Sequence, residues 1–191
     1  VVTILKLRAP GMSLDRMPVF VWASLVTSLM IIFSMPAVVL SSTFLLSDRL
    51  VGTHFYNYAE GGDLLLFQHL YWYFAHPEVY IIFLPSIALM AMIVPTFAQR
   101  PIFGYSFIVL AAVGTGFLSF GLWAHHMFTI GLPAISQGFF SAASEAVVIP
   151  TGVQIFVFIA TLLLGRVVPS TPMLFAAGAL VIFVIGGLTG V

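Results

Sequence analysis

Long apolar stretches separated by short polar links make up most of this chain. A transmembrane helix needs about 20 mostly apolar residues, and we place five such stretches at residues 19–46, 64–97, 103–130, 139–164 and 173–191. Pro36 interrupts the first stretch, and prolines are tolerated in membrane helices when neighbouring groups satisfy the freed carbonyls. The pattern therefore predicts an all-α fold: a polytopic transmembrane helix bundle that forms one membrane domain.

The composition excludes a soluble protein. Hydrophobic residues make up 61% of the chain and charged residues only 6%, whereas soluble domains carry about 25% charged residues. The net charge is zero, so no basic surface is available to neutralise nucleic-acid phosphates. The chain has no cysteine, so any metal site must use imidazole, carboxylate or thioether ligands.

Basic residues mark one side of the membrane. They occupy alternate links, at residues 6–16, Arg100 and Arg166, whereas the opposite links hold only Arg49 beside several acidic residues. Since basic residues favour the cytoplasmic side, the chain is expected to enter its first span from inside. The chain begins without an initiator methionine and stops within an apolar run, so we expect it to be a fragment of a longer membrane protein.

Ionisable groups within the hydrocarbon region are costly, which makes each of them a functional candidate. His76 lies in the second stretch, about 12 residues and roughly 18 Å from its outer start at the rise of an α-helix. Tyr80 follows His76 by four residues, so the two side chains share one helical face and can touch. Glu78 is two residues from each of them and must point to a different face.

Two adjacent histidines, His125 and His126, end the third stretch at a depth similar to that of His76. Neighbouring residues on an α-helix diverge by about 100°, so both rings can reach one ion only where the helix end loosens. A single membrane histidine often bonds a nearby carbonyl, and paired histidines at a helix end often lie among headgroups. Taken together with Tyr80 and Glu78, the three imidazoles instead favour a trigonal nitrogen site with an open position, which suits copper or zinc and not magnesium.

Several runs of the sequence resemble one family. They are QHLYWYFAHPEVY, WAHHMFTIG, IPTGVQIF, LRAPGM and VIFVIGGLTGV. They are similar to the haem-copper oxidase catalytic subunit, subunit I of cytochrome c oxidases. The resemblance spans essentially the whole chain and corresponds to the fifth to ninth of the family's roughly twelve helices.

The resemblance implies a role for each residue of this cluster. Tyr80 resembles the tyrosine that is covalently joined to a copper-ligand histidine and supplies an electron and a proton. Glu78 resembles the glutamate that donates protons for chemistry and pumping, and Trp72 matches the aromatic residue beside the copper. The ligands of the copper called Cu-B are then His76, His125 and His126.

The implied activity is that of a terminal respiratory oxidase, which reduces O2 to water at a haem–copper centre and couples this to proton translocation and electron transport. The iron ligands of the low-spin and high-spin haems would lie outside residues 1–191. The implied partners are oxidase subunits II and III, with cytochrome c or a quinol as the electron donor. The Ala/Val-rich spans favour a bacterial or archaeal plasma membrane over the mitochondrial inner membrane.

Two positions depart from the family pattern. Gln154 stands where the family's second proton path has a lysine, and Ala91 where it has a serine, although Thr151 and Ser144 remain. A glutamine can hydrogen-bond a water chain but cannot carry a proton as lysine does. These changes allow a nitric-oxide reductase-like relative, against which Tyr80 argues. A non-catalytic divergent membrane subunit is the other alternative, and the three intact histidines argue against it.

Three other polar residues receive less specific interpretations. We expect His69 to serve structural packing and His54 to be a solvated loop residue. Glu145 is interpreted as a carboxylate near the outer end of the fourth stretch, either in proton exit or at an interface, or simply reaching toward the headgroups.

Overall fold

The computed structural model describes residues 1–190, and no strand occurs among them. The prediction of an all-α transmembrane bundle is therefore confirmed. The long helices are α2 (Val19–Leu50), α3 (Leu64–Phe97), α4 (Tyr105–Leu118), α5 (Ala134–Ala146), α6 (Val148–Leu164) and α7 (Thr171–Gly190). The short elements are α1 (Val2–Lys6) and the 3₁₀ segments η1 (Leu14–Arg16), η2 (Tyr58–Glu60), η3 (Ser119–Gly121) and η4 (Trp123–Ile130).

Five helical stretches are long and apolar enough to cross a membrane. The third combines α4 with η3 and η4, and the fourth joins α5 to α6. Helix α2 ends at Leu50, four residues beyond the expected boundary, and the fourth stretch begins at Ala134 instead of residue 139. The helix continues through Pro36 in α2 and through the three prolines of α3.

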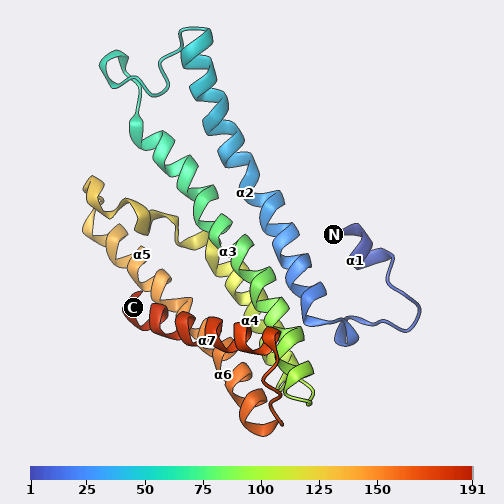
Figure 1. The fold of residues 1–191 in the computed structure, drawn as a ribbon. Coiled ribbons are helices and arrows are strands. Elements are labelled where there is room, and N and C mark those ends of the chain that lie inside the picture. The colour runs from blue at the N-terminus through green and yellow to red at the C-terminus, as the bar shows by residue number, and fades with distance from the viewer. Residues whose placement is uncertain (191) are drawn as a thin grey trace.

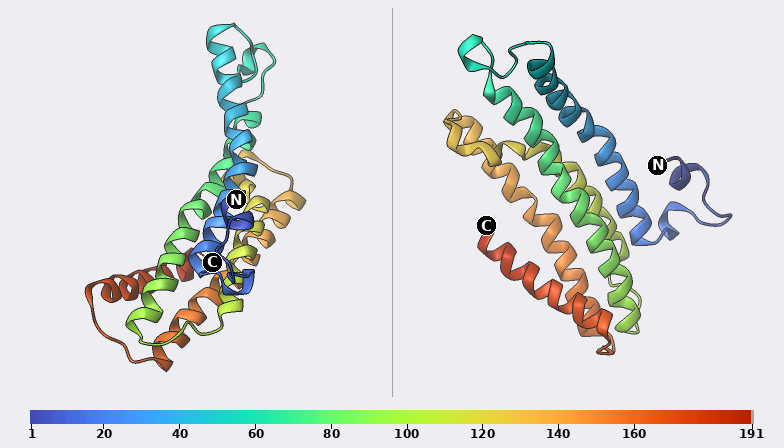
Figure 2. Two further views of the ribbon diagram at one scale, coloured as in Figure 1. Left: turned by 90° about the vertical axis from the view of Figure 1, so that its right-hand side faces the viewer. Right: turned by 45° about the horizontal axis from the view of Figure 1, so that its top comes forward.

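Helices α2 and α3 form an antiparallel pair that reaches beyond the rest of the molecule (Figure 1). Helix α4 packs against both α2 and α6, and α7 returns across α3 at a steep angle to the other helices, as the side view shows (Figure 2). This arrangement leaves the 3₁₀ segment η4 against α3 on one side and α5 on the other.

A buried apolar cluster joins five of these helices. It includes Val19 of α2, Ile87 of α3, Ile108 of α4, Phe158 of α6 and Leu180 of α7. Helix α2 also approaches α4 closely: a Cβ added at Gly116 of α4 would collide with the Val26 side chain. Close approach at small residues is the usual way in which membrane helices pack.

The links that carry Arg100 and Arg166 lie together at one end of the bundle. The Arg100 guanidinium donates to the Leu164 carbonyl at 2.9 Å, and the Arg166 backbone N–H donates to the Ala98 carbonyl at 2.8 Å. Both links thus lie on one side of the membrane, in agreement with the basic-residue pattern.

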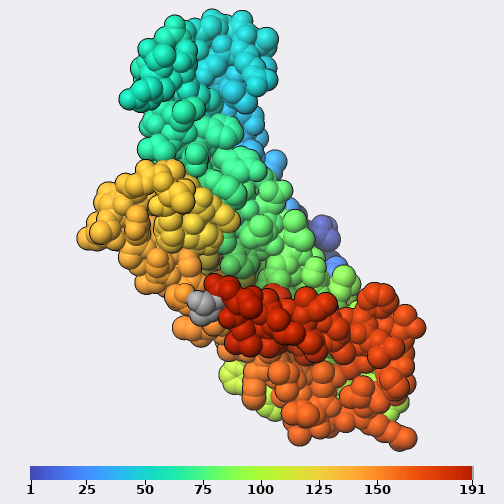
Figure 3. Space-filling model, turned by 60° about the vertical axis from the view of Figure 1, so that its left-hand side comes forward, coloured from blue at the N-terminus to red at the C-terminus, as the bar shows by residue number. Residues whose placement is uncertain are grey.

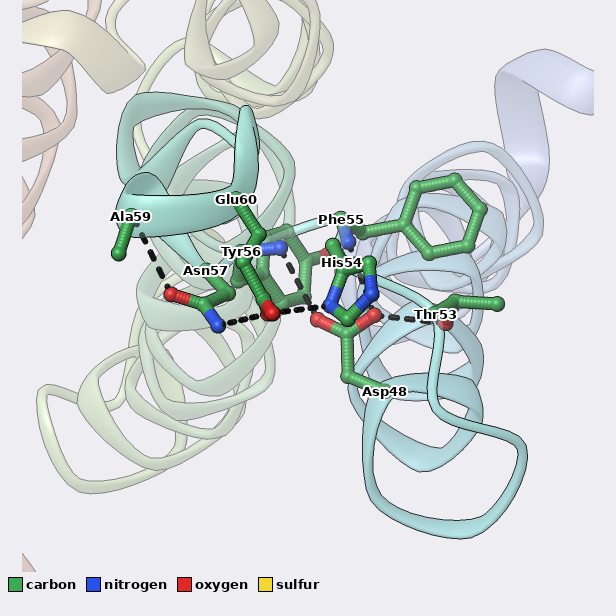
Figure 4. Close-up of polar contacts among 8 residues, drawn as sticks. All are labelled: Asp48, Thr53, His54, Phe55, Tyr56, Asn57, Ala59 and Glu60. Atoms are coloured by element: carbon green, nitrogen blue, oxygen red, sulfur yellow. Dashed lines mark hydrogen bonds and ion pairs between the residues drawn. The ribbon is translucent and has the colours of Figure 1, made fainter.

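The loop at the opposite end is organised by Asp48 (Figure 4). Its carboxylate accepts hydrogen bonds from the Thr53 hydroxyl at 2.7 Å and from the backbone N–H groups of Phe55 and Tyr56 at 2.9 Å each. Tyr56 is buried and donates its hydroxyl to the Ser41 carbonyl at 3.1 Å. Burial, aided by the Asp48 charge, raises the pKa of Tyr56 above its ordinary value.

Candidate metal centre

Helix α3 brings His76 into the interior of the bundle. The helix starts at a cap in which the Asp63 carboxylate accepts from the Leu65 backbone N–H at 2.8 Å. His76 lies in the fourth turn and is only 4% exposed. Pro77, directly after it, has no N–H to offer the Tyr73 carbonyl, yet the helix continues.

His125 and His126 lie in η4, where the third membrane stretch is no longer α-helical. The α-helix ends at Leu118, and Met127, which follows the two histidines, has non-helical torsions of φ −125° and ψ 16°. The His125 and His126 rings lie 4.4 Å apart between centroids and are tilted by 48°. This is the loosened helix end that two adjacent ligands require.

The three histidines converge on one point. The His76 Nδ1 and His126 Nε2 atoms are 3.0 Å apart, and the ring centroids of His76 and His125 are 4.5 Å apart. One ligand nitrogen from each residue lies within 4.8 Å of the other two. Figure 3 shows the yellow surface of η4 and the start of α5 lying against the green surface of α3, which is the junction that holds them.

A hydrogen bond to Ser144 of α5 assigns the protonation of His125. The Ser144 hydroxyl must donate to the Phe140 carbonyl, 2.6 Å away, because a carbonyl only accepts. The same oxygen lies 2.7 Å from His125 Nδ1 and has one proton, already used, so the Nδ1–H of His125 is the donor. His125 Nε2 is therefore the free lone pair that can face a metal.

Two aromatic side chains of α3 pack on the histidines. The Trp72 ring stacks on His126 with centroids 4.0 Å apart and an interplanar angle of 4°. The Tyr80 ring lies 4.8 Å from the His76 ring. The buried Nε2 of His76 has no hydrogen-bond partner among the described residues, so this atom is available for a further bond.

Glu78 does not join the cluster, as its position two residues from His76 and Tyr80 predicts. It is half-buried on α3, and the group of possible metal ligands among the described residues comprises the three histidines alone.

Gln154 of α6 is fully buried. Its Nε2 donates to the Thr115 hydroxyl of α4 at 3.2 Å, whereas its Oε1 has no partner among the described residues. Ala91, on α3, is buried with an apolar side chain. Thr151 donates to the carbonyl of Val147, the residue that caps α6. Among the described residues, no hydrogen bond joins the side chains of Gln154, Ala91 and Thr151 to one another.

The less specific interpretations have different outcomes. His54 lies in the outer loop, about half exposed, with its Nδ1 2.7 Å from a Glu60 carboxylate oxygen. His69 packs at η4 and also accepts a hydrogen bond from Trp123, a contact that the sequence did not indicate. Glu145 is exposed, and because the fourth stretch starts at Ala134 it lies 11 residues from the outer start, deeper than expected.

Sequence comparisons find relatives over the whole of this chain. A family model described as "Cytochrome C and Quinol oxidase polypeptide I" matches residues 1–191. Cytochrome c oxidase subunit 1 of Cereibacter sphaeroides is 44% identical over 191 residues, which cover 100% of this chain and 34% of that protein. The subunit 1 proteins of Bacillus sp. strain PS3 and Bacillus subtilis strain 168 are 45% and 44% identical, over 100% and 99% of this chain and 31% and 30% of their own lengths.

The chain thus spans about a third of the length of these curated relatives. The match covers the whole of this chain in two of these relatives and so includes α3 and η4, the two elements that bring the histidines together. The chain belongs to the cytochrome c and quinol oxidase polypeptide I family.

Proposed function

We propose that the complete protein is a terminal oxidase that reduces O2 to water at a haem–copper centre, and that the copper is held by His76, His125 and His126. The observation that carries the proposal is the convergence of these three imidazoles, from two separate elements, to within 4.8 Å. The family and the relatives support the haem-copper class.

The donor set fits copper. Imidazole nitrogens suit copper, zinc and iron, whereas calcium and magnesium prefer oxygen. The His76 Nδ1 and His126 Nε2 atoms lie 3.0 Å apart, close enough for both nitrogens to bind one ion. Three protein ligands leave a position open, and the copper, together with a haem iron, would supply the O2-binding position and electrons.

Tyr80 is proposed as a proton and electron donor at this site. Its ring lies against His76, whose buried Nε2 has no hydrogen-bond partner among the described residues, and we propose that this nitrogen forms a covalent bond to a Tyr80 ring carbon. Forming that bond removes one hydrogen from the nitrogen and one from the carbon. This is a two-electron oxidation, for which the substrate O2 is the oxidant.

Glu78 is proposed to deliver protons, and Trp72 to hold His126. Glu78 lies on α3 two residues from the ligand, on a different face, where it can pass a proton toward the site without occupying it. The stacked Trp72 ring restricts the rotation of His126. Proton translocation would use the same carboxylate, since a membrane-embedded acid is costly unless it has a function.

The partners follow from the family. Oxidase subunits II and III would be its partners, and electrons from cytochrome c or a quinol would arrive from a partner subunit through a low-spin haem whose ligands lie outside residues 1–191. The five apolar helices make the protein an integral membrane protein, and the relatives named above are bacterial. We therefore favour a bacterial or archaeal plasma membrane.

Gln154 and Ala91 give the second candidate a basis. Residue 154 is not a lysine, so the polar route through α6 departs from the oxidase pattern that the rest of the chain follows. This departure leaves a nitric-oxide reductase-like activity as the alternative. Tyr80 favours O2, because two-electron reduction of nitric oxide does not require the tyrosine. Turnover of the complete enzyme with O2 and with nitric oxide distinguishes the two.

Metal analysis of His126→Ala in the full subunit tests the site. Removing one of three ligands should abolish stoichiometric copper binding at this site while the haem content stays normal. His54→Ala, which removes a histidine from the outer loop, should retain both metals. A His126→Ala protein with full copper stoichiometry and normal turnover would contradict the assignment.

A further inference from the structure

One face of α3 contacts η4 over about two helical turns. His69 and His76 are seven residues apart and therefore lie on the same face. His76 lies 3.0 Å from His126, and His69 lies within hydrogen-bond distance of Trp123, three residues before His126. Helix α3 and η4 are thus joined by polar contacts at two points. Both residues of the His76–His126 contact are candidate metal ligands, whereas neither His69 nor Trp123 is one.

The contact at His69 has a defined direction. The Trp123 Nε1–H is a donor only, and it lies 3.2 Å from His69 Nδ1. His69 therefore accepts at Nδ1 and carries its proton on Nε2. A neutral imidazole in this tautomer, or another side chain with an acceptor at the same place, is needed to keep the contact.

Trp123 is also held by aromatic packing from two helices. Its ring meets Tyr73 of α3 edge to face, with centroids 5.3 Å apart and an angle of 75°. It meets Phe140 of α5 at 5.0 Å and 71°. The neighbouring residues Leu122 and Ala124 are 1% and 0% exposed, so the start of η4 is enclosed on both sides of Trp123.

The η4 segment depends on such outside contacts. A 3₁₀ helix has poorer hydrogen-bond geometry than an α-helix and is seldom longer than three or four residues, and η4 consists of two such short helices separated by a kink. Its torsions break at Met127, immediately after the two histidines. The backbone of η4 therefore holds His125 and His126 only weakly. The hydrogen bond of Trp123, two residues before His125, then fixes the position of both rings.

We propose that His69 is a positioning residue of the metal centre: by accepting the indole N–H of Trp123 it fixes η4 on α3 and so places His125 and His126 for the metal. This inference rests on the proposed copper site. His69 touches no reacting group, and it acts through Trp123.

The test uses the assembled oxidase with four single variants of the full subunit and the double variant His69→Leu/Trp123→Phe. His69→Leu keeps most of the side-chain volume but removes the acceptor, and His69→Asn places a carboxamide oxygen where Nδ1 stood. Trp123→Phe keeps an aromatic ring between Tyr73 and Phe140 but removes the donor. Gln68→Leu is the matched control, because it changes the adjacent half-buried polar residue on a face about 100° away.

Two quantities are measured. The first is the copper dissociation constant by competition with a chelator, and the second is backbone amide exchange of the metal-depleted protein. His69→Leu and Trp123→Phe should each weaken copper binding about tenfold, at the lower end of the effect of losing an outer-shell partner. The double variant should be no weaker than Trp123→Phe alone, since both changes remove one interaction. His69→Asn should bind copper nearly as wild type does, and Gln68→Leu should match wild type.

Amide exchange separates positioning from general packing. Faster exchange confined to residues 123–130 in His69→Leu, with residues 81–97 of α3 unchanged, supports the proposal. Faster exchange throughout the bundle, or copper binding equal to wild type in His69→Leu, overturns it. If the wild-type oxidase binds no copper at the three histidines, the proposed function fails, whereas the exchange pattern still decides whether His69 holds η4.

Discussion

Replacing Ser144 by alanine probes the site without altering a ligand. The Ser144 hydroxyl accepts the Nδ1–H of His125 at 2.7 Å and donates to the Phe140 carbonyl at 2.6 Å. In Ser144→Ala the Phe140 carbonyl keeps its place in the i to i−4 ladder of α5. The half-buried Nδ1–H of His125 loses its acceptor, so the change acts almost entirely on His125.

The size of the effect follows from two considerations. Leaving a buried donor without a partner costs about 1–3 kcal/mol, and loss of an outer-shell partner lowers metal affinity about 10–100-fold, or 1.4–2.7 kcal/mol. The tautomer matters as well, because without Ser144 the proton of His125 can move to Nε2, the nitrogen that must face the metal. We therefore expect copper affinity to fall by about 10–100-fold with the haem content unchanged.

Chelator competition on the assembled oxidase measures this loss. Ser144→Thr restores a hydroxyl and should return most of the affinity, whereas Ser141→Ala, one turn earlier on α5 and exposed, should behave as wild type. Copper affinity equal to wild type in Ser144→Ala would refute the reasoning, because His125 would then not depend on this bond for its tautomer or its orientation.

Three further outcomes are expected in the complete enzyme. Tyr80→Phe should give a folded, haem-containing protein that cannot complete reduction of O2 to water. Peptide mass spectrometry of the active wild type should find residues 76 and 80 covalently joined, and a free Tyr80 in fully active enzyme would contradict this. Glu78→Gln keeps the shape and hydrogen bonding but removes the transferable proton, so stopped-flow oxidation should show proton uptake slowed by orders of magnitude with electron entry intact. Gln154→Leu removes one hydrogen bond together with an amide oxygen that has no partner among the described residues, so the free energy of unfolding should change by less than about 1 kcal/mol. Turnover should fall far less than in Glu78→Gln. A severe block in Gln154→Leu would show that the route through α6 carries protons.

The membrane helices could be predicted because burial in lipid imposes a simple rule. Every backbone polar group must be satisfied within the segment, so long apolar runs become helices, and α3 has the bounds that its apolar run predicts, Leu64–Phe97. The third stretch shows where that rule ends. Its apolar composition continues to Ile130, but its helix changes to 3₁₀ geometry after Leu118, a change that depends on contacts with α3 and α5 and has no periodic signal.

The three histidines could be found from the sequence because their cost in a membrane makes them conspicuous, whereas their supporting contacts could not. Ser144 is a common hydroxyl residue 19 positions after His125, and His69 is 54 positions before Trp123. Nothing in composition or spacing distinguishes these residues from others that merely pack. Ser144 and His69 acquire their roles only when α3, η4 and α5 pack together. The three candidate histidines can therefore be found from the sequence, whereas the orientation of their rings depends on the packing of three separate elements. Because this chain contains all three elements, it also contains the contacts that orient the three histidines of the proposed copper site.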